Sequence, residues 1–442
     1  MLEPFLSECL NDDVILQVVP TTEVSHPVRT HPSIFFIKNL RTSKVYHFCV
    51  DHPDCISDGL YMVIKTLNKL KGKKWVLDKK SVTQLLCGQL NNLYDINLCE
   101  FLINNKIIEF CEFYTKSHFL ITSNASSGYC INRYIPLLKH KESFMDFCEV
   151  AEKVINDYNI DNAYLKLNNE FIDTLAKIEE NGIYVDINEF SKHFDSNLIS
   201  GNLVYSQYNI YTSTGRPSNR FGGVNYAALN ATDGSRKSFI SRYGKDGQMV
   251  VIDYSAFHPR IICYLVGYSV PVKTDIYGYL SKLYFQKEDV NEYDIAESKK
   301  ITFRQLYGGV EDKYSHIKYL SHLKDFINME WEFFKNNGYV LTPFFERKIT
   351  DKHITDPNPN KLFNYILQAS EGEIAIPLLG QVNEYVKDKK TKVVLYTYDA
   401  VLYDFHRDDM RILRDIMDIM SDGGKFPIKC YCGESYQDVI QF

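Results

Sequence analysis

The sequence has no long apolar run, no cysteine pair at zinc-binding spacing and no excess of basic residues. A membrane-spanning helix needs about 20 apolar residues, so none is expected, and the first residues lack the basic segment of a signal peptide. The eleven cysteines contain no C-x-x-C pair, a pattern typical of a reducing cytosol. Cys430 and Cys432 alternate as in a strand, which favours a place in the core over a metal site.

The net charge of −6 argues against a chain-wide electrostatic grip on nucleic acid, while a local basic surface stays open. No internal repeat or low-complexity linker is present. The chain is long and rich in apolar residues: it has 442 residues, of which 45% are apolar and 14% aromatic. This length and composition are enough for about three domains with large cores.

Two stretches place an acid at the end of a buried strand. Val250-Val251-Ile252 runs into Asp253, and Val393-Val394-Leu395 leads to Asp399, which lies at the tip of a predicted hairpin. A carboxylate at such a place is costly unless it is paired, and a cation is its usual partner. Two converging strand-borne carboxylates can hold Mg²⁺ ions for phosphoryl transfer.

Residues 1–125 alternate strand-like and helix-like segments, which predicts an α/β domain with a hairpin over 33–50. This region carries a lysine run with two interpretations, a nucleic-acid face or a solvated helix end and loop, of which we favour the second. Its members are Lys65, Lys69, Lys71, Lys73, Lys74, Lys79 and Lys80.

Three polar patterns follow, each with an alternative left open. Residues 211–220 contain Thr214, Arg216 and Arg220, a set typical of phosphate contacts or of a plain surface loop. A helix predicted over 292–306 leads into Tyr307 and carries Lys299, Phe303 and Tyr307 on one face. This face is either a nucleotide-binding site or a buried apolar stripe whose lysine extends its charged end to solvent. Asn364 and Gln368 lie at i and i+4 of a helix predicted over 362–387. Their amides either form hydrogen bonds to buried backbone or contact the minor-groove edge of a base pair.

The order of these segments resembles a family A DNA polymerase of the bacterial Pol I and phage type, from about residue 130 to the C-terminus. Asp253-Tyr254-Ser255 with Arg260 resembles the first palm motif, and Lys299, Phe303, Tyr307 and Gly308 match the fingers helix at the family's spacing. The other matching segments are Thr214-Gly215-Arg216, Asp275-Ile276-Tyr277, Gly338–Thr342, Phe363-Asn364 with Gln368, Asp399, and Glu180–Asp186.

The resemblance implies an α+β right-hand polymerase, with an antiparallel palm sheet, helical fingers and a reduced thumb, preceded by an α/β 3′–5′ exonuclease-like domain. We expect the exonuclease-like domain at 1–130, a helical connector and reduced thumb at 131–210, palm at 211–270, fingers at 271–335 and palm again at 336–442. The thumb is reduced because 25 residues between Asp186 and Thr212 cannot form two long helices.

The resemblance also implies template-directed transfer of dNTPs to a primer 3′ end, with two Mg²⁺ ions (Mn²⁺ as a substitute) held by Asp253, Asp399 and the Tyr254 carbonyl. Lys299 would offset triphosphate charge and protonate pyrophosphate. Tyr254, His258, Tyr277, Phe303 and Tyr307 would complete the nucleotide pocket. Thr214, Arg216, Asn364 and Gln368 would hold the primer–template DNA.

The chain departs from the family's pattern at several positions. His258 replaces the Glu that shields the sugar 2′ position, Tyr398 and Ala400 replace the residues flanking the last Asp, and Ile295 replaces an Arg. The predicted first strand, from Leu16 to Glu23, lacks the Asp-x-Glu of a proofreading site. Asp78 and Asp95 do not make a metal set without it. We therefore expect no exonuclease activity.

Two further function classes remain beside an active polymerase: a non-catalytic or weakly catalytic protein that binds primer ends, and a polymerase that accepts ribonucleotides or makes RNA. We expect a phage origin, a cytoplasmic location (the host cytoplasm if the chain is viral) and no membrane association. A processivity factor, a helicase or a single-strand-binding protein are the candidate partners of a polymerase with a small thumb.

Overall fold

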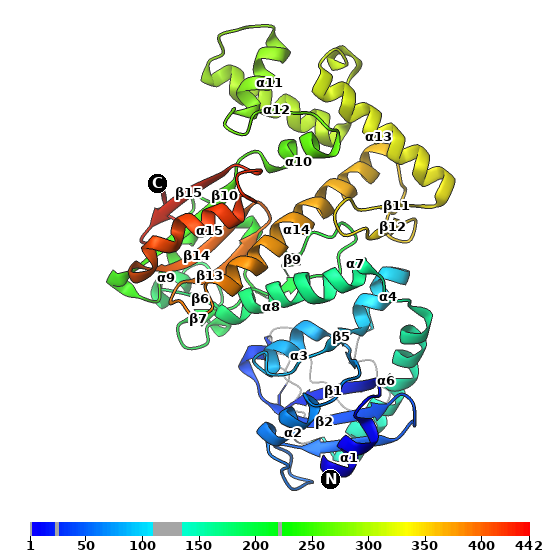
Figure 1. Ribbon diagram of the computed structural model, residues 1–442. Coiled ribbons are helices and arrows are strands. Elements are labelled where there is room, and N and C mark those ends of the chain that lie inside the picture. Colours follow the sequence, from blue (N-terminus) through cyan, green and yellow to red (C-terminus); the bar gives the residue numbers. More distant parts are fainter. Residues whose placement is uncertain (1, 23–25, 109–134, 220–222) are drawn as a thin grey trace. The chain divides into compact units, whose positions relative to one another are not determined.

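The computed structural model describes residues 2–22, 26–108, 135–219 and 223–442. The chain divides into two compact units, one ending at Glu180 and the other beginning at Asn181, apart from a short stretch around Gly223 that groups with the first. Each unit has its own five-stranded sheet (Figure 1). Three features of the sequence analysis lie outside the described residues: Glu23 at the end of the predicted first strand, Arg220 of the predicted phosphate-contact segment, and the predicted boundary at 130/131.

The sheet of the first unit has the strand order β3-β2-β1-β4-β5. β1 pairs antiparallel with β2, and β2 with β3, whereas β1–β4 and β4–β5 are parallel. The predicted hairpin and the α/β character are thereby confirmed. The strands are β1 (Val14–Pro20), β2 (Pro32–Asn39), β3 (Val45–Cys49), β4 (Lys74–Val76) and β5 (Leu93–Asp95).

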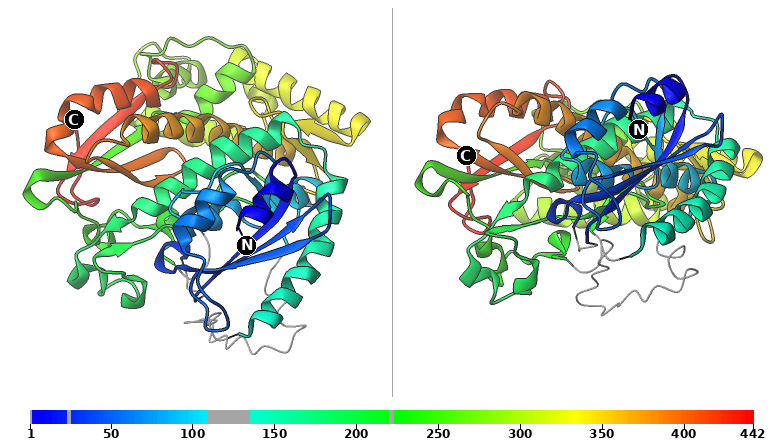
Figure 2. Two further views of the ribbon diagram at one scale, coloured as in Figure 1. Left: turned by 60° about the horizontal axis from the view of Figure 1, so that its bottom comes forward. Right: turned by 90° about the horizontal axis from the view of Figure 1, so that it is seen from below.

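Helices cover both faces of this sheet, and β2 shows how the sequence arranges it. All eight of its residues are buried, because successive side chains point to opposite faces. Phe35 and Ile37 join a core with Phe5 of α1, while Phe36 stacks on Phe144 of α6 at 5.5 Å. The ribbons of α1 and α6 lie along this sheet in Figure 2. The helices are α1 (Leu2–Cys9), α2 (Leu60–Leu67), α3 (Lys79–Leu85), α4 (Ile96–Asn104), α6 (Leu137–Asp157), α7 (Asn162–Lys166) and α8 (Ile172–Asn181).

The lysine run is only partly a surface feature. Lys74, Lys79 and Lys80 are buried. Lys74 donates to Asn91, Lys79 to Asn168 O, and Lys80 to Glu179 Oε1 at 2.6 Å. Both interpretations of the run were therefore wrong for these three residues, which hold elements of the unit together. Lys65, Lys69 and Lys71 are exposed.

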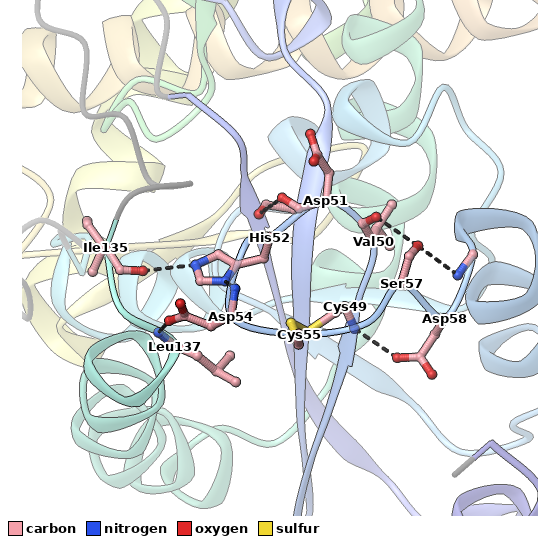
Figure 3. Close-up of a disulfide and its surroundings, with 12 residues drawn as sticks. Cys49, Val50, Asp51, His52, Asp54, Cys55, Ser57, Asp58, Ile135 and Leu137 are labelled. Carbon is pink, nitrogen blue, oxygen red and sulfur yellow. Dashed lines mark hydrogen bonds between the residues drawn. A yellow bond between two sulfur atoms is a disulfide. The ribbon is translucent and has the colours of Figure 1, made fainter.

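A disulfide joins Cys49 at the end of β3 to Cys55 (Figure 3). The sequence pattern predicted thiols kept reduced, and this pair corrects that prediction. Cys49 N also donates to Asp58 Oδ2, and His52 Nε2 lies 2.9 Å from Ile135 O. The disulfide and these two contacts thus restrain residues 49–58.

The sheet of the second unit confirms the predicted antiparallel architecture. Its order is β13-β14-β10-β15-β16, and every neighbouring pair is antiparallel. The predicted hairpin around Asp399 is the β13–β14 connection. The strands are β10 (Gly247–Tyr254), β13 (Lys392–Thr397), β14 (Ala400–His406), β15 (Ile428–Gly433) and β16 (Ile440–Gln441).

The long helix α14 packs against α10, α12, α13 and α15 (Figure 1). Its 27 residues include a buried stretch from Ala369 to Ile376, which makes it the central helix of this unit. Three pairs of short strands complete it: β6 (Ile183–Tyr184) with β7 (Leu203–Val204), β8 (Tyr208–Asn209) with β9 (Ser218–Asn219), and β11 (Tyr339–Leu341) with β12 (Lys348–Thr350). The helices are α9 (Ile187–Phe190), α10 (Phe257–Leu265), α11 (Ile276–Phe285), α12 (Glu292–Gly308), α13 (Lys318–Asn337), α14 (Pro359–Tyr385) and α15 (Leu413–Met420).

Residues 187–211 contain only short elements. They are α9, one short 3-10 turn, β7 (Leu203–Val204) and β8 (Tyr208–Asn209). The prediction that this segment cannot form two long helices is confirmed. Within the described ranges, no helix is both long and apolar enough to cross a membrane.

Candidate active site

Asp253 and Asp399 lie side by side because the strands that carry them are neighbours. Asp253 is the penultimate residue of β10 and pairs in register with Ala400, the first residue of β14. Asp399 occupies the tight turn just before β14, after Tyr398, whose φ of 68° is left-handed. Tyr254 N donates a 2.8 Å hydrogen bond to Asp399 O, so the backbone fixes the two acids together.

Burial and a neighbouring acid make ionisation of both carboxylates costly. Burial, followed by repulsion from Asp399, raises the pKa of Asp253 to about 6, although Lys429 and Lys299 act against it. Burial, followed by repulsion from Glu371, raises the pKa of Asp399. Like charges held close together disfavour ionisation, and a bound cation removes that penalty.

A left-handed residue leads from β10 into α10. Ala256 has a φ of 54°, a conformation that costs a non-glycine residue about 1–2 kcal/mol. The turn brings Phe257 under Tyr254, with ring centroids 4.0 Å apart, and Tyr254 Oη donates to Met420 O. The Tyr254 side chain thus belongs to the core, and its carbonyl is the group left for a metal.

Arg260 of α10 fixes the chain that enters α11. Its guanidinium donates to the carbonyl oxygens of Val270, Pro271, Val272 and Thr274. Asp275 then caps α11 by accepting from Tyr277 N and Gly278 N. This segment places Tyr277 beside α12, where Ser298 Oγ donates to Tyr277 O.

One face of α12 points into the site, as the spacing predicted. Phe303 and Tyr307 stack with their rings 6° from parallel and 5.9 Å apart. Lys299 Nζ lies 5.7 Å from the Tyr277 ring and 5.9 Å from the Phe303 ring. Lys299 and Tyr307 are exposed, so the core-stripe alternative is wrong for this face.

A carboxylate that the sequence analysis did not identify lies behind this face. Glu371 of α14 is 1% exposed, and its Oε2 lies 2.6 Å from Arg216 Nη2 and 3.3 Å from His258 Nε2. His258 Nδ1 in turn lies 2.5 Å from Tyr307 Oη. Burial opposes ionisation of Glu371, but His258 and Arg216 hold the pKa of its carboxyl below the usual value.

The loop that carries Thr214 and Arg216 needs its glycine. Gly215 has a φ of +73°, and a Cβ there would come within 2.8 Å of Arg347 Nη2. Arg347 is buried and donates to Ser213 O. Held in this way, the Arg216 guanidinium lies over the Tyr398 ring at 4.0 Å.

These side chains surround a cavity of about 300 Å³. Nine of the predicted site residues line it: Arg216, Asp253, Tyr254, His258, Tyr277, Lys299, Phe303, Tyr307 and Asp399. Thr214, Asn364 and Gln368 do not. Asn364 Nδ2 donates to Tyr307 O, which matches the backbone-bonding alternative. A second cavity, of about 420 Å³, also touches Asp253 and Asp399.

The cavity wall contains two charged residues that the sequence analysis missed, Glu371 and Lys429. Glu371 lies three residues after Gln368 and seven after Asn364, so helical spacing could have placed it on the same face. Lys429 pairs in register with Asp253 across β10 and β15. No local signal could have found it, because that pairing joins distant segments.

The residues present fit a divalent cation. Asp253, Asp399 and the Tyr254 carbonyl supply oxygen ligands, which Mg²⁺ and Mn²⁺ prefer, and burial followed by a nearby acid raises the pKa of both carboxyls, a cost that a bound cation would offset. In the described part of the chain, no group of three or more His, Cys, Asp or Glu side chains gathers as a further candidate metal site.

Comparison with solved structures identifies the fold. The POL domain of Pol1 from M. smegmatis, in complex with a DNA primer-template and dNTP, matches with a TM-score of 0.73 at 13% sequence identity. The chain has the fold of a polymerase POL domain. The match covers 99% of this chain and 98% of that one, so the POL-domain fold accounts for both units. No protein-family model and no curated protein matches the sequence.

Proposed function

We propose that this chain is a template-directed DNA polymerase that adds dNTPs to a primer 3′ end by two-metal nucleotidyl transfer. The observation that carries the proposal is that Asp253 and Asp399, held side by side by neighbouring strands, line the same cavity as Lys299 of α12. The M. smegmatis domain of the same fold was solved with a primer-template and dNTP, the substrates that this cavity would take.

Asp253, Asp399 and the Tyr254 carbonyl would hold two Mg²⁺ ions, with Mn²⁺ as a substitute. When bound, these ions supply Lewis-acid activation of the primer hydroxyl and neutralise charge on the triphosphate. Lys299 would bind the triphosphate and donate a proton to the leaving pyrophosphate. Its exposed ammonium at the cavity wall suits both tasks.

Phe303, Tyr307 and Tyr277 would bind the base and sugar of the incoming nucleotide. The parallel rings of Phe303 and Tyr307 form a flat apolar surface, which a base can cover. By the resemblance, the sugar would lie beside His258 and Tyr307, which both line the cavity and are 2.5 Å apart from Nδ1 to Oη.

Arg216, with Thr214, Asn364 and Gln368 nearby, would hold the primer–template close to its end. The second cavity supports this role, since it joins the two aspartates to Tyr226, Arg236 and Tyr436. Arg236 lies over the Tyr436 ring at 4.7 Å. A cation and aromatic rings are the groups that bind a nucleic-acid end by charge and stacking.

We further propose that the first unit is exonuclease-like in fold but does not proofread. β1 reads VILQVVP and carries no carboxylate. Asp78 and Asp95 are both engaged as helix caps, Asp78 accepting from Ser81 N and Asp95 from Leu98 N. A metal-dependent nuclease needs acids that are free to bind metal, and these two stabilise α3 and α4 instead.

We also propose low intrinsic processivity. The segment 187–211 lacks the long helices with which a thumb grips duplex DNA. A processivity factor, a helicase or a single-strand-binding protein would then keep the enzyme on its template.

A primer-extension assay tests the proposal. The protein is incubated with a labelled primer–template and Mg²⁺, with dNTPs or with rNTPs, beside an Asp253→Ala control. We expect extension with dNTPs, none with the control, and no shortening of the primer when nucleotides are omitted. Absence of extension with either nucleotide set contradicts the polymerase proposal, and shortening contradicts the proposal on proofreading.

The alternative is a protein that binds primer ends without catalysis. Ala400 and Ile295 favour it, since the family has charged residues at these positions. Binding of the primer–template with no extension, in Mg²⁺ and in Mn²⁺, would support it. Equal extension with dNTPs and rNTPs would instead support a ribonucleotide-tolerant enzyme.

A further inference from the structure

Four side chains from four separate segments form a continuous chain at the sugar end of the cavity. Arg216 comes from the loop before β9 (Ser218–Asn219), Glu371 from α14, His258 from α10 and Tyr307 from α12. The successive contacts are 2.6 Å from Arg216 Nη2 to Glu371 Oε2, 3.3 Å from Glu371 Oε2 to His258 Nε2, and 2.5 Å from His258 Nδ1 to Tyr307 Oη.

Glu371 is the centre of this chain. It is 1% exposed and is the carboxylate of the cavity wall that faces His258. The family's pattern has a Glu at the position of His258, next to the Tyr matched by Tyr307. In this protein, a carboxylate is still present beside that Tyr, but α14 supplies it and His258 stands between the two.

We propose that Glu371 is a positioning residue for sugar selection: it holds His258 against Tyr307, so that the pair favours deoxyribonucleotides over ribonucleotides. The inference rests on the proposed polymerase function. Glu371 itself need not touch the nucleotide, because it acts through the ring of His258.

The chemistry of the contacts explains the selection. Glu371 Oε2 lies 3.3 Å from His258 Nε2 without an aligned hydrogen bond, and the negative charge of the carboxylate favours a proton on the nitrogen that faces it. In the neutral ring, Nδ1 is then an acceptor, and the Tyr307 hydroxyl donates to it. The phenol is thereby fixed in place and its proton is committed to His258. A ribose 2′-hydroxyl would have to displace this arrangement or be buried without a donor, which is costly.

Arg216 secures the other side of Glu371. Its guanidinium offsets the negative charge of the buried carboxylate and lies over Tyr398, next to Asp399. The same carboxylate therefore joins the sugar end of the site to the loop proposed to hold DNA. A purely structural role for Glu371 predicts equal effects on both nucleotide types, whereas the positioning role predicts a change in their ratio.

The test measures single-nucleotide incorporation of a dNTP and the matching rNTP by the full chain and by Glu371→Gln. The readout is the ratio of kcat/KM values for the two nucleotides. We expect the preference for dNTP to fall about tenfold, which corresponds to about 1.4 kcal/mol for the lost charge contact with His258, with a smaller change in kcat/KM for dNTP. Glu373→Gln is the matched control, since Glu373 is buried on the same helix and accepts from Phe345 N instead.

Two further variants keep the test decisive if Glu371→Gln does not fold. Tyr307→Phe removes the hydroxyl at the exposed end of the chain and should lower the ratio by a similar factor. The double variant His258→Glu with Glu371→Gln returns a carboxylate to position 258 and should restore the ratio. An unchanged ratio in Tyr307→Phe, or an equal loss for both nucleotides in Glu371→Gln, overturns the proposal.

The outcomes separate this inference from the proposed function. If the unaltered protein extends primers with dNTPs and rNTPs equally, the polymerase proposal stands and the selection proposal is wrong. If it binds primer–template and extends with neither, the polymerase proposal itself is wrong.

Discussion

The amide of Tyr254 donates a 2.8 Å hydrogen bond to the carbonyl of Asp399. This bond joins the end of β10 to the turn before β14 and brings two acids 146 positions apart in the chain, Asp253 and Asp399, to one edge of the cavity. Because the contact is made by backbone, side-chain substitutions at either acid should leave the geometry intact. A loss of activity in these variants therefore reports on chemistry rather than on a displaced backbone.

Asp253→Asn and Asp399→Asn should each lower primer extension by about a thousandfold or more, since a metal site supplies several kcal/mol of charge stabilisation and each 1.4 kcal/mol is about tenfold in rate. Single-turnover incorporation measures the effect. Asp246→Asn, an exposed residue just before β10, is the control and should retain activity. Full activity in either test variant would contradict the assigned roles.

Asp253→Asn should stabilise the metal-free protein at pH 8. The folded-state pKa of about 6 lies above the value of about 3.9 for a free Asp. The folded state therefore binds more protons between these values, and the free energy of unfolding falls as the pH rises through that window. Removing the charge should recover on the order of 1–2 kcal/mol at pH 8 and nothing at pH 3.5.

Urea denaturation at the two pH values measures this difference. Added Mg²⁺ should stabilise the unaltered protein at pH 8 and have little effect on Asp253→Asn. A variant less stable than the unaltered protein at pH 8, without metal, would contradict the prediction that burial and Asp399 make the ionised Asp253 side chain costly.

Glu179→Gln should destabilise the first unit by about 3–5 kcal/mol at pH 7, the usual cost of removing one partner of a buried ion pair. Burial acts to raise the pKa of Glu179, but Lys80 and His26 overcome it and lower the pKa to about 2. The contribution is complete above the unfolded pKa of about 4.3 and is lost as the pH falls toward 2. Acid unfolding followed by circular dichroism should therefore be flatter in the variant.

Glu180→Gln provides the control one residue along the same helix. Glu180 forms a partly exposed pair with Lys177, and such pairs contribute about 0–1 kcal/mol. Equal losses in the Glu179 and Glu180 variants would contradict the argument from burial.

Cys49→Ser should lower the free energy of unfolding by about 2 kcal/mol, because the disulfide closes a small loop of the unfolded chain. The two cysteines are six positions apart. Thermal unfolding with and without dithiothreitol measures the effect: the reductant should lower the Tm of the unaltered protein and leave that of the variant unchanged. Cys87→Ser, at an exposed free thiol, is the control, and a Tm insensitive to reductant in the unaltered protein would contradict the prediction.

Local patterns in the sequence predicted much of the site. The β-branched run before Asp253 and the i, i+4, i+8 spacing of Lys299, Phe303 and Tyr307 each follow from the geometry of a single strand or helix. These elements form where the sequence places them. Their roles in DNA synthesis remain predictions, as do the DNA contacts of Thr214, Asn364 and Gln368.

Local patterns could not predict which charged side chains are buried by contacts with distant parts of the chain. Lys74, Lys79 and Lys80 looked like part of a basic surface, yet each is buried against a partner at least 17 positions away. A run of lysines carries no information about which members will meet a carboxylate or a carbonyl. The Cys49–Cys55 disulfide is a similar case, because pairing depends on where the strand β3 ends in space.

The sequence by itself determined the two strand-borne acids, the polar face of α12 and the absence of long helices between Asp186 and Thr212, since each depends on local periodicity or on chain length. Only the tertiary structure decided that Glu371 stands behind His258 and that Lys429 stands beside Asp253. Those neighbours come from segments 113 and 176 positions apart in the chain, and packing alone brings them together. The departure at His258 therefore has its explanation in α14, which the sequence motif around Asp253 does not contain.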